Sequence, residues 1–111
     1  MNVDQQQMED LTVLRPRGPL IGTDAEQFES NLAKAIEERA GRVVLDASTV
    51  PFADSRGLEV LADATEKQIR NGMALKLAGA NDTLREALEL TELAALFEYF
   101  DDVETAVESF G

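Results

Sequence analysis

The sequence predicts a single α/β domain, because short apolar runs alternate with longer segments of helical periodicity. The clearest strand is residues 43–45, Val-Val-Leu, an apolar run typical of a strand that is buried on both faces. Segments with apolar residues at helical spacing precede and follow it, and this order indicates a partly parallel sheet covered by helices. A chain of 111 residues is long enough for one domain with its own core.

The first part of the chain predicts one interrupted strand. Residues 1–9 are rich in glutamine and acidic residues, so we expect a loose lead-in, with the domain itself occupying residues 10–111. Residues 11–14 alternate enough to predict a strand, which Pro16 interrupts because proline cannot donate to a sheet ladder. Residues 20–21 are expected to resume a short edge pairing.

Two helices are predicted, one before and one after the apolar run at 43–45. Residues 23–26, Thr-Asp-Ala-Glu, form a capping box and predict the start of the first helix, which residues 40–41, Ala-Gly, end. The second helix follows Ser55, and residues 71–72, Asn-Gly, provide its C-terminal cap. Helical spacing predicts that its apolar face consists of Leu58, Leu61, Ala62, Thr65 and Ile69.

The rest of the chain predicts two more strands and two more helices. Residues 73–79 are typical of a strand, and either residue of the pair 81–82, Asn-Asp, is placed to cap a helix that follows. The dense apolar patch at residues 93–100 is expected to divide between a turn and a short strand, and residues 101–102, Asp-Asp, to open a last helix. The expected architecture is a small mixed sheet with about four helices.

The composition excludes several classes of function. The formal net charge of −12 disfavours nonspecific binding to nucleic acid or to an anionic membrane, because phosphate contacts need clustered lysine and arginine. A partner with a basic face fits better, but the simpler explanation is that the acidity keeps the protein soluble, and charge alone names no partner. The chain has no cysteine and no histidine, so no metal or other cofactor is expected. Residues 1–10 lack the apolar core of a signal peptide, and no apolar run approaches the roughly 20 residues of a membrane span, so we expect a cytoplasmic protein.

The most informative segment is residues 50–58, Val-Pro-Phe-Ala-Asp-Ser-Arg-Gly-Leu, which places Ser55 at the expected start of a helix. The first turn of a helix has unpaired N–H groups and the positive end of the helix dipole. A serine there either caps the helix or, when phosphorylated, places its phosphate on an anion-binding site. Asp54 can cap instead, which would leave Ser55 exposed. Gly57 lies inside the predicted helix, where glycine costs up to about 1 kcal/mol against alanine. It either permits tight packing of the loop or allows close backbone approach by a partner or by a neighbouring strand.

Residues 43–58 resemble the signature of STAS domains, the sulfate transporter and anti-sigma factor antagonist family. In that family a strand ends in Asp or Asn, a loop follows, and Asp-Ser-x-Gly-Leu opens the next helix. The corresponding residues here are Leu45-Asp46 and residues 54–58, Asp-Ser-Arg-Gly-Leu.

Two further segments match the family in order. Residues 18–20, Gly-Pro-Leu, are similar to the family's Gly-x-Leu before its first helix. Residues 88–93, followed by Phe97 and the terminal helix, are similar to its closing pattern. With these flanks in register, the resemblance covers residues 10–110 and implies the fold of a single STAS domain.

The resemblance implies a regulatory protein without catalytic activity of its own. A lone STAS domain of this size is usually a bacterial anti-sigma factor antagonist, which binds an anti-sigma factor that is also a serine kinase and so frees the sigma factor. The kinase phosphorylates the serine of the motif, here Ser55, the complex dissociates, and a phosphatase resets it. The implied partner-binding residues are Asp54, Ser55, Arg56, Gly57, Leu58, Ile21 and Asp46.

Two positions depart from the family pattern. Arg56 stands where these antagonists commonly have a small or hydroxylic residue, and Ile21 stands where many members have Asp. These departures keep a second function within the family open. In that function the chain is a scaffold subunit of a stress-signalling complex or of a lipid ABC transporter, and it docks through the same surface without a phosphoswitch.

Two unrelated functions fit the residues less well. Residues 43–46 resemble the phospho-aspartate strand of a response-regulator receiver, but a receiver needs an acidic pair after its first strand to hold Mg²⁺, and residues 15–18 are Arg-Pro-Arg-Gly. An enzymatic function is disfavoured because the chain has no histidine to activate a serine nucleophile and no glycine-rich phosphate loop. Its site would have to draw on Asp46, Asp54, Ser55 and Lys76. We expect Asp46 instead to end a strand and accept a hydrogen bond from a nearby backbone N–H.

Overall fold

The computed structural model describes all residues from Met1 to Gly111, and strands and helices alternate along it as the sequence predicts. The elements are β1 (Asn2–Met8), β2 (Leu11–Arg17), α1 (Gly22–Glu38), β3 (Val43–Asp46), α2 (Ser55–Arg70), β4 (Leu75–Ala78), α3 (Asp82–Leu90), the 3-10 turn η1 (Ala94–Leu96), β5 (Phe97–Phe100) and α4 (Val103–Glu108). The strands form one five-stranded sheet in the order β1-β2-β3-β4-β5. β1 is antiparallel to β2 and all other neighbours are parallel, which confirms the α/β class and the mixed sheet.

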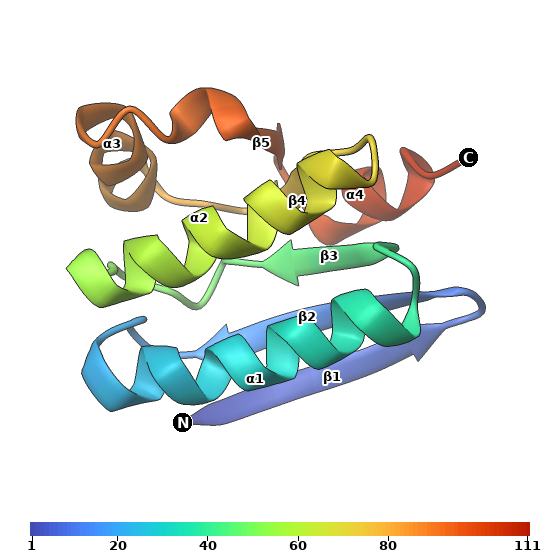
Figure 1. Ribbon diagram of the computed structural model, residues 1–111, viewed down its shortest axis with the longest axis horizontal. Helices are drawn as coiled ribbons and strands as arrows, with labels where there is room; N and C mark the ends of the chain where they lie inside the picture. The colour runs from blue at the N-terminus through green and yellow to red at the C-terminus, as the bar shows by residue number, and fades with distance from the viewer.

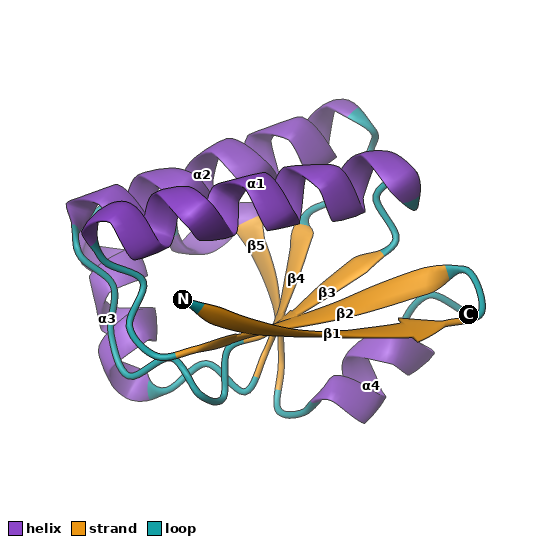
Figure 2. Cartoon of the chain, turned by 90° about the horizontal axis from the view of Figure 1, so that it is seen from below, coloured by secondary structure: helices purple, strands orange, loops and turns teal.

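The helices cover the two faces of the sheet unequally. Figure 2 shows α1 and α2 side by side on one face and the short α4 on the other. In Figure 1 the N-terminal ends of α1 and α2 lie at the same end of the molecule, where the loops that leave β2 and β3 also meet. None of the helices has the length and apolarity that a membrane crossing requires.

Two apolar clusters form the core, one on each face of the sheet. The larger lies under α1 and α2 and includes the fully buried Phe28 and Leu61. The smaller lies under α4 and includes Ala106. β3 contributes to both, because Leu45 belongs to the larger cluster and Val44 to the smaller, as the two-residue repeat of a strand requires.

The expected loose lead-in at residues 1–9 is wrong, because residues 2–8 form β1. β1 pairs with β2 along its whole length. The Arg17 guanidinium and the Asp4 carboxylate form an ion pair between the two strands, with 2.6 Å between Nη2 and Oδ2. Most side chains of β1 are exposed because the strand lies at the sheet edge, so its polar composition, which favoured a loop, is compatible with a strand.

Two further details of the N-terminal half differ from the prediction. Pro16 does not end the strand: it lies within β2 but beyond the parallel pairing with β3, which involves residues 12–14, so no ladder hydrogen bond to β3 is lost. α1 begins at Gly22 and not at a capping box on Thr23. Its N-cap residue, Ile21, makes no side-chain cap hydrogen bond, so the N–H groups of α1 need another acceptor.

The buried face of α2 is rotated from the predicted one. Leu61 and Thr65 are buried as expected, but Ile69 is 46% exposed. The other buried positions are Gly57, Val60, Ala64 and Gln68. Apolar spacing did not predict this rotation, because Gly57, which has no apolar side chain, is one of the residues that face the core.

The predicted helix ends are confirmed where a glycine or a polar cap marks them. Gly41 follows α1 with a φ of 87°, a left-handed conformation that glycine adopts without strain. Asn81 caps α3 and Asp102 caps α4, each by accepting a hydrogen bond from a backbone N–H three residues later.

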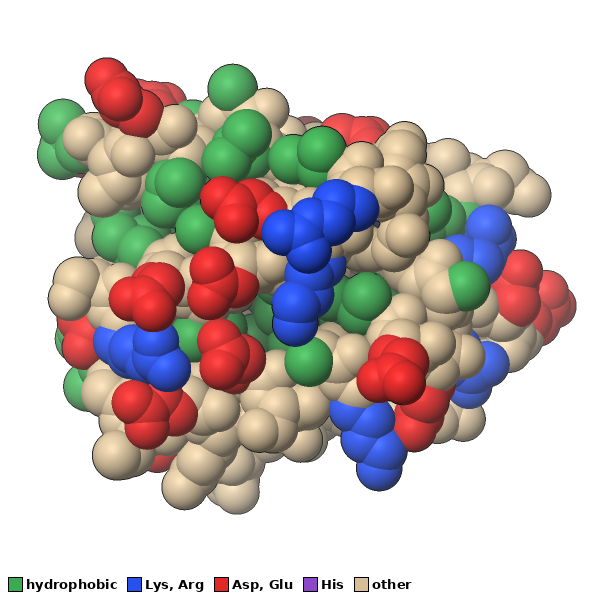
Figure 3. Space-filling model, in the orientation of Figure 1, with side chains coloured by type: hydrophobic (Ala, Val, Ile, Leu, Met, Phe, Trp, Pro, Cys, Tyr) green, Lys and Arg blue, Asp and Glu red, His purple; other side chains and the backbone are tan.

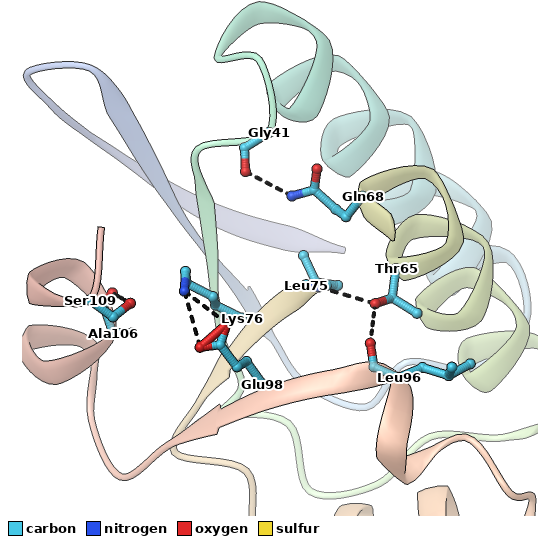
Figure 4. A network of polar contacts seen from close by, with 9 residues as sticks. All are labelled: Gly41, Thr65, Gln68, Leu75, Lys76, Leu96, Glu98, Ala106 and Ser109. Carbon is cyan, nitrogen blue, oxygen red and sulfur yellow. Dashed lines mark hydrogen bonds and ion pairs between the residues drawn. The ribbon is translucent and has the colours of Figure 1, made fainter. Parts of the chain in front are cut away.

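A buried hydroxyl ties α2 to the last two strands (Figure 4). Thr65 is fully buried, and its Oγ1 donates to the Leu96 carbonyl at 2.5 Å and accepts from the Leu75 N–H at 3.1 Å. Leu75 begins β4 and Leu96 immediately precedes β5, so a single side chain satisfies backbone groups of both. Figure 4 also shows the Gln68 side-chain amide donating to the Gly41 carbonyl at 2.7 Å.

We predict that Thr65→Val lowers the free energy of unfolding by about 1–3 kcal/mol, because the substitution keeps the side-chain shape but leaves the buried Leu75 N–H and the half-buried Leu96 carbonyl without this partner. Urea unfolding followed by circular dichroism measures this difference. Thr65→Ser keeps the hydroxyl and serves as the control. If Thr65→Val is as stable as Thr65→Ser, the hydroxyl does not have the role assigned to it.

Candidate functional site

The loop between β3 and α2 is fixed to the segment that precedes α1. Leu20 forms a parallel bridge with Ala53, its N–H donates to the Phe52 carbonyl at 3.1 Å, and its carbonyl accepts from the Asp54 N–H at 3.1 Å. The short edge pairing expected at residues 20–21 is therefore present, and its partner is this loop. The pairing holds the first residues of α1 and α2 next to each other.

One carboxylate caps both helices. Oδ1 of Asp54 accepts from the Gly57 N–H at 2.8 Å in the first turn of α2, and Oδ2 accepts from the Gly22 N–H at 3.0 Å at the first residue of α1. Each of the two carboxylate oxygens therefore lies at the positive end of a helix dipole, Oδ1 at α2 and Oδ2 at α1. The hydrogen bond from Gly57, with that from Gly22, holds the pKa of Asp54 below its usual value. Asp54 thus supplies the cap that Thr23 was expected to provide.

Gly57 is required by the close approach of the Leu20 backbone. A Cβ atom at position 57 would collide with the Leu20 carbonyl oxygen, the atom that accepts from the Asp54 N–H. The close backbone approach expected at this glycine is confirmed. Any larger residue would have to push apart the two segments that the Asp54 carboxylate holds together.

Ser55 is exposed, and its hydroxyl makes no hydrogen bond within the protein. It is the first residue of α2, and the N-cap position before it belongs to Asp54. Of the two uses considered for this serine, the structure excludes the capping role. The hydroxyl is left on the surface at the start of α2, where another molecule can reach it.

Arg56 is held by two carboxylates. Its Nε lies 3.2 Å from Oε1 of Glu26 on α1, and its Nη1 lies 2.7 Å from Oε1 of Glu59 on α2. The guanidinium therefore bridges the two helices beside Ser55 and is already charge-paired. Exposed ion pairs of this kind contribute little to stability, so their main effect is to fix where the charges lie.

Asp46 does not share the surface of Ser55. It is buried, and its carboxylate accepts from the Ser48 N–H at 3.0 Å and from Nε of Arg15 at 2.6 Å. Burial raises the pKa of Asp46, but the hydrogen bonds from Ser48 and Arg15 outweigh it and leave the pKa below its usual value. The expected bond to a nearby backbone N–H is confirmed. Asp46 lines a hollow with Arg15, Ser48 and residues 101–104, and Ser55 is not part of this hollow.

The other predicted surface residues are partly accessible. Ile21 and Leu58 are half-buried, and Leu58 packs against the larger core cluster. Phe52, on the same loop as Ser55, is 46% exposed and was missed as a candidate contact. An aromatic residue in a loop next to the motif was the available signal, since exposed aromatic side chains are common anchors of protein interfaces.

We predict that Asp54→Asn lowers the midpoint of thermal unfolding by a few degrees, because an amide has one acceptor oxygen and cannot cap both helices. The depressed pKa of Asp54 adds a pH dependence. Its stabilising effect is present above the pKa of an unfolded aspartate, about 4, and is lost as the pH falls through the lower folded-state pKa. The unfolding temperatures of wild type and variant should therefore converge in acid.

Asp102→Asn is the matched control, because Asp102 caps α4 alone and the amide keeps the one acceptor that this cap needs. Thermal unfolding of the three proteins across the acid range, followed by circular dichroism, makes the comparison. An Asp54→Asn protein that loses no more stability than Asp102→Asn at neutral pH would contradict the double cap.

Comparison with known proteins identifies the family. The STAS domain profile matches residues 2–106. A protein of Bordetella bronchiseptica named "Putative anti-sigma factor antagonist BtrV" is 26% identical over 111 residues, which cover 99% of this chain and 95% of that protein. The two sequences are therefore similar from end to end.

Solved structures share the fold. The anti-sigma factor antagonist SpoIIAA in its unphosphorylated form superposes with a TM-score of 0.80 at 17% identity, covering 98% of this chain and 96% of that one. The Bacillus cell fate determinant SpoIIAA in its phosphorylated form superposes with a TM-score of 0.73 at 17% identity, covering 99% of this chain and 100% of that one. Together, the profile match and the shared fold show that the chain belongs to the STAS domain family.

Proposed function

We propose that this protein is an anti-sigma factor antagonist, that its partner is an anti-sigma factor with serine kinase activity, and that phosphorylation of Ser55 separates the two. The observation that carries the proposal is the exposed Ser55 hydroxyl, which is free because Asp54 has taken over the capping role. The names of BtrV and SpoIIAA support the same function. The role requires no catalytic activity of the chain itself, and a phosphatase would reset it.

Phosphorylation at Ser55 is expected to change the surface and leave the fold unchanged. A phosphoserine adds about −1.5 to −2 charge near neutral pH. The N–H groups of Gly57 and Gly22 are already bonded to Asp54, so a phosphate on Ser55 could bind them only by displacing that carboxylate. The phosphate stays at the surface, where a partner without a matching cation would have to desolvate it at a cost of several kcal/mol.

The surroundings of Ser55 reduce any local effect on stability. Glu59 lies one helical turn after Ser55 on the same side of α2 and would repel a phosphate, but Arg56 pairs with this carboxylate. The helix dipole favours the phosphate by about 0.3–1 kcal/mol. Because these effects are small and opposed, the phosphate acts on the partner. The unphosphorylated and phosphorylated forms of SpoIIAA both superpose on this chain, which supports a fold that phosphorylation preserves.

We predict that a kinase-like anti-sigma factor is recovered when the tagged protein is used as bait, and that the purified partner adds one phosphate to Ser55 in the presence of Mg-ATP. Intact-mass analysis followed by peptide mapping locates the phosphate. Ser55→Ala should not be modified, whereas Ser30→Ala, an exposed serine on α1, should be modified like wild type. Ser55→Ala should keep binding, and Ser55→Asp should bind about tenfold more weakly.

Two results would contradict the proposal. A phosphate that maps to another residue would overturn the assignment of Ser55, and an Asp variant that binds as tightly as wild type would remove the electrostatic block. Recovery of a transporter ATPase or of a stress-signalling assembly, with Ser55 unmodified, would instead support the scaffold function. The ion pairs of Arg56 with Glu26 and Glu59 are compatible with that alternative, because they leave no unpaired cation beside Ser55 to bind a phosphate.

A further inference from the structure

A shallow groove runs between α1 and α2, away from the Ser55 loop. Its volume is about 20 Å³, enough for about one water molecule. In Figure 3 apolar side chains are visible in a hollow between acidic and basic side chains, over the face that α1 and α2 cover. The apolar lining includes Ala33, Ile36 and Ala64, and the charged residues at its rim are Glu29, Asp63 and Lys67.

The two carboxylates at the rim have no cation of their own. Glu29 and Asp63 make no ion pair within 4.0 Å, in contrast to Glu26 and Glu59 nearby, which both pair with Arg56. Figure 3 shows acidic side chains gathered over the N-terminal ends of the two helices around a single basic one. Two unpaired carboxylates beside an apolar hollow are complementary to a group that is apolar at one end and cationic at the other.

The size of the groove distinguishes a protein partner from a small molecule. Ligand pockets usually enclose about 300–1,000 Å³ and bury most of the ligand, whereas this groove is smaller and open. A depression this shallow encloses no ligand, but its apolar lining is a surface on which one apolar side chain of a protein partner can pack. The net charge of −12 also favours a basic partner, because it accelerates the approach of opposite charge.

The groove and the serine belong to one continuous surface. Ser55, Glu59, Asp63 and Lys67 follow one another at intervals of four residues and so form a single row along α2. Eight residues of helix separate Ser55 from Asp63, a distance of about 12 Å. A protein that contacts Ser55 reaches the groove easily, because a typical interface buries about 800 Å² on each partner.

We propose that the partner that binds the Ser55 loop packs one apolar side chain on the apolar depression between α1 and α2 and places an adjacent lysine or arginine against Glu29 and Asp63. The identity of this partner rests on the proposed function. The same arrangement explains why an acidic surface can attract a partner that a phosphate repels. The cation lies about 12 Å from Ser55, beyond the screening length of about 8 Å at physiological salt, so it gains little from the phosphate.

A short helical peptide of leucine and lysine tests the chemistry of the groove without the partner. In ¹⁵N-¹H NMR titrations, the amide shifts should concentrate at the groove, and Glu29→Lys/Asp63→Lys should weaken binding about tenfold. Ala33→Phe fills the groove without changing the charge and should weaken binding as well. Glu86→Lys/Glu89→Lys on α3 makes the same change in net charge elsewhere and should have little effect. Shifts spread equally over the acidic residues of α3 and α4 would overturn the proposal.

The purified kinase that modifies Ser55 then tests whether the natural partner uses the groove. Glu29→Lys/Asp63→Lys should raise the KM for this protein about tenfold, and the α3 control should not. If the kinase phosphorylates Ser55 with an unchanged KM, the groove is not its docking site, although the proposed function stands. If no kinase modifies Ser55 but the peptide binds the groove, the proposed function fails and the groove remains a site for a basic protein segment.

Discussion

The Asp54 carboxylate, which accepts one hydrogen bond from each of two helices, is the interaction on which the site depends. Without it the first N–H of α1 has no side-chain acceptor, because Ile21 cannot provide one. The same residue donates its own N–H to the Leu20 carbonyl, and only glycine at position 57 allows that carbonyl to lie so close to α2. A cap, a loop pairing and a glycine therefore act together to fix where both helices begin.

This constraint decides what is left for function. Because the carboxylate accepts the N–H groups of Gly57 and Gly22, the cap of α2 needs no serine and Ser55 remains a free hydroxyl at the surface. Arg56 is immobilised by Glu26 and Glu59 and does not compensate the charge of a future phosphate. In the function that we propose, a protein partner senses one added charge at this position, and the groove between α1 and α2 is its second point of attachment.

The parts of this structure that local patterns encode could be predicted, and those that depend on distant contacts could not. Helical and strand periodicity, the turn at Gly41 and the cap at Asn81 are signalled within a few residues. β1 was missed because a polar edge strand has the composition of a loop. The capping box at residues 23–26 was misleading because the true acceptor for α1 comes from Asp54, 32 residues after Gly22. At the site, the motif indicated Ser55 and its possible exposure, but not the pairing of Arg56, which depends on a residue of α1.

The decisive measurement compares the free energy of unfolding of the protein that carries phosphoserine at position 55 with that of the unmodified protein. It tests whether Asp54 leaves Ser55 free to act at the surface alone. Chemical denaturation of the two forms provides both values. We expect the two values to agree within about 1 kcal/mol, because the phosphate replaces no existing contact. A loss of about 3 kcal/mol or more on phosphorylation would show that the phosphate disturbs the capped loop, and would contradict a surface block.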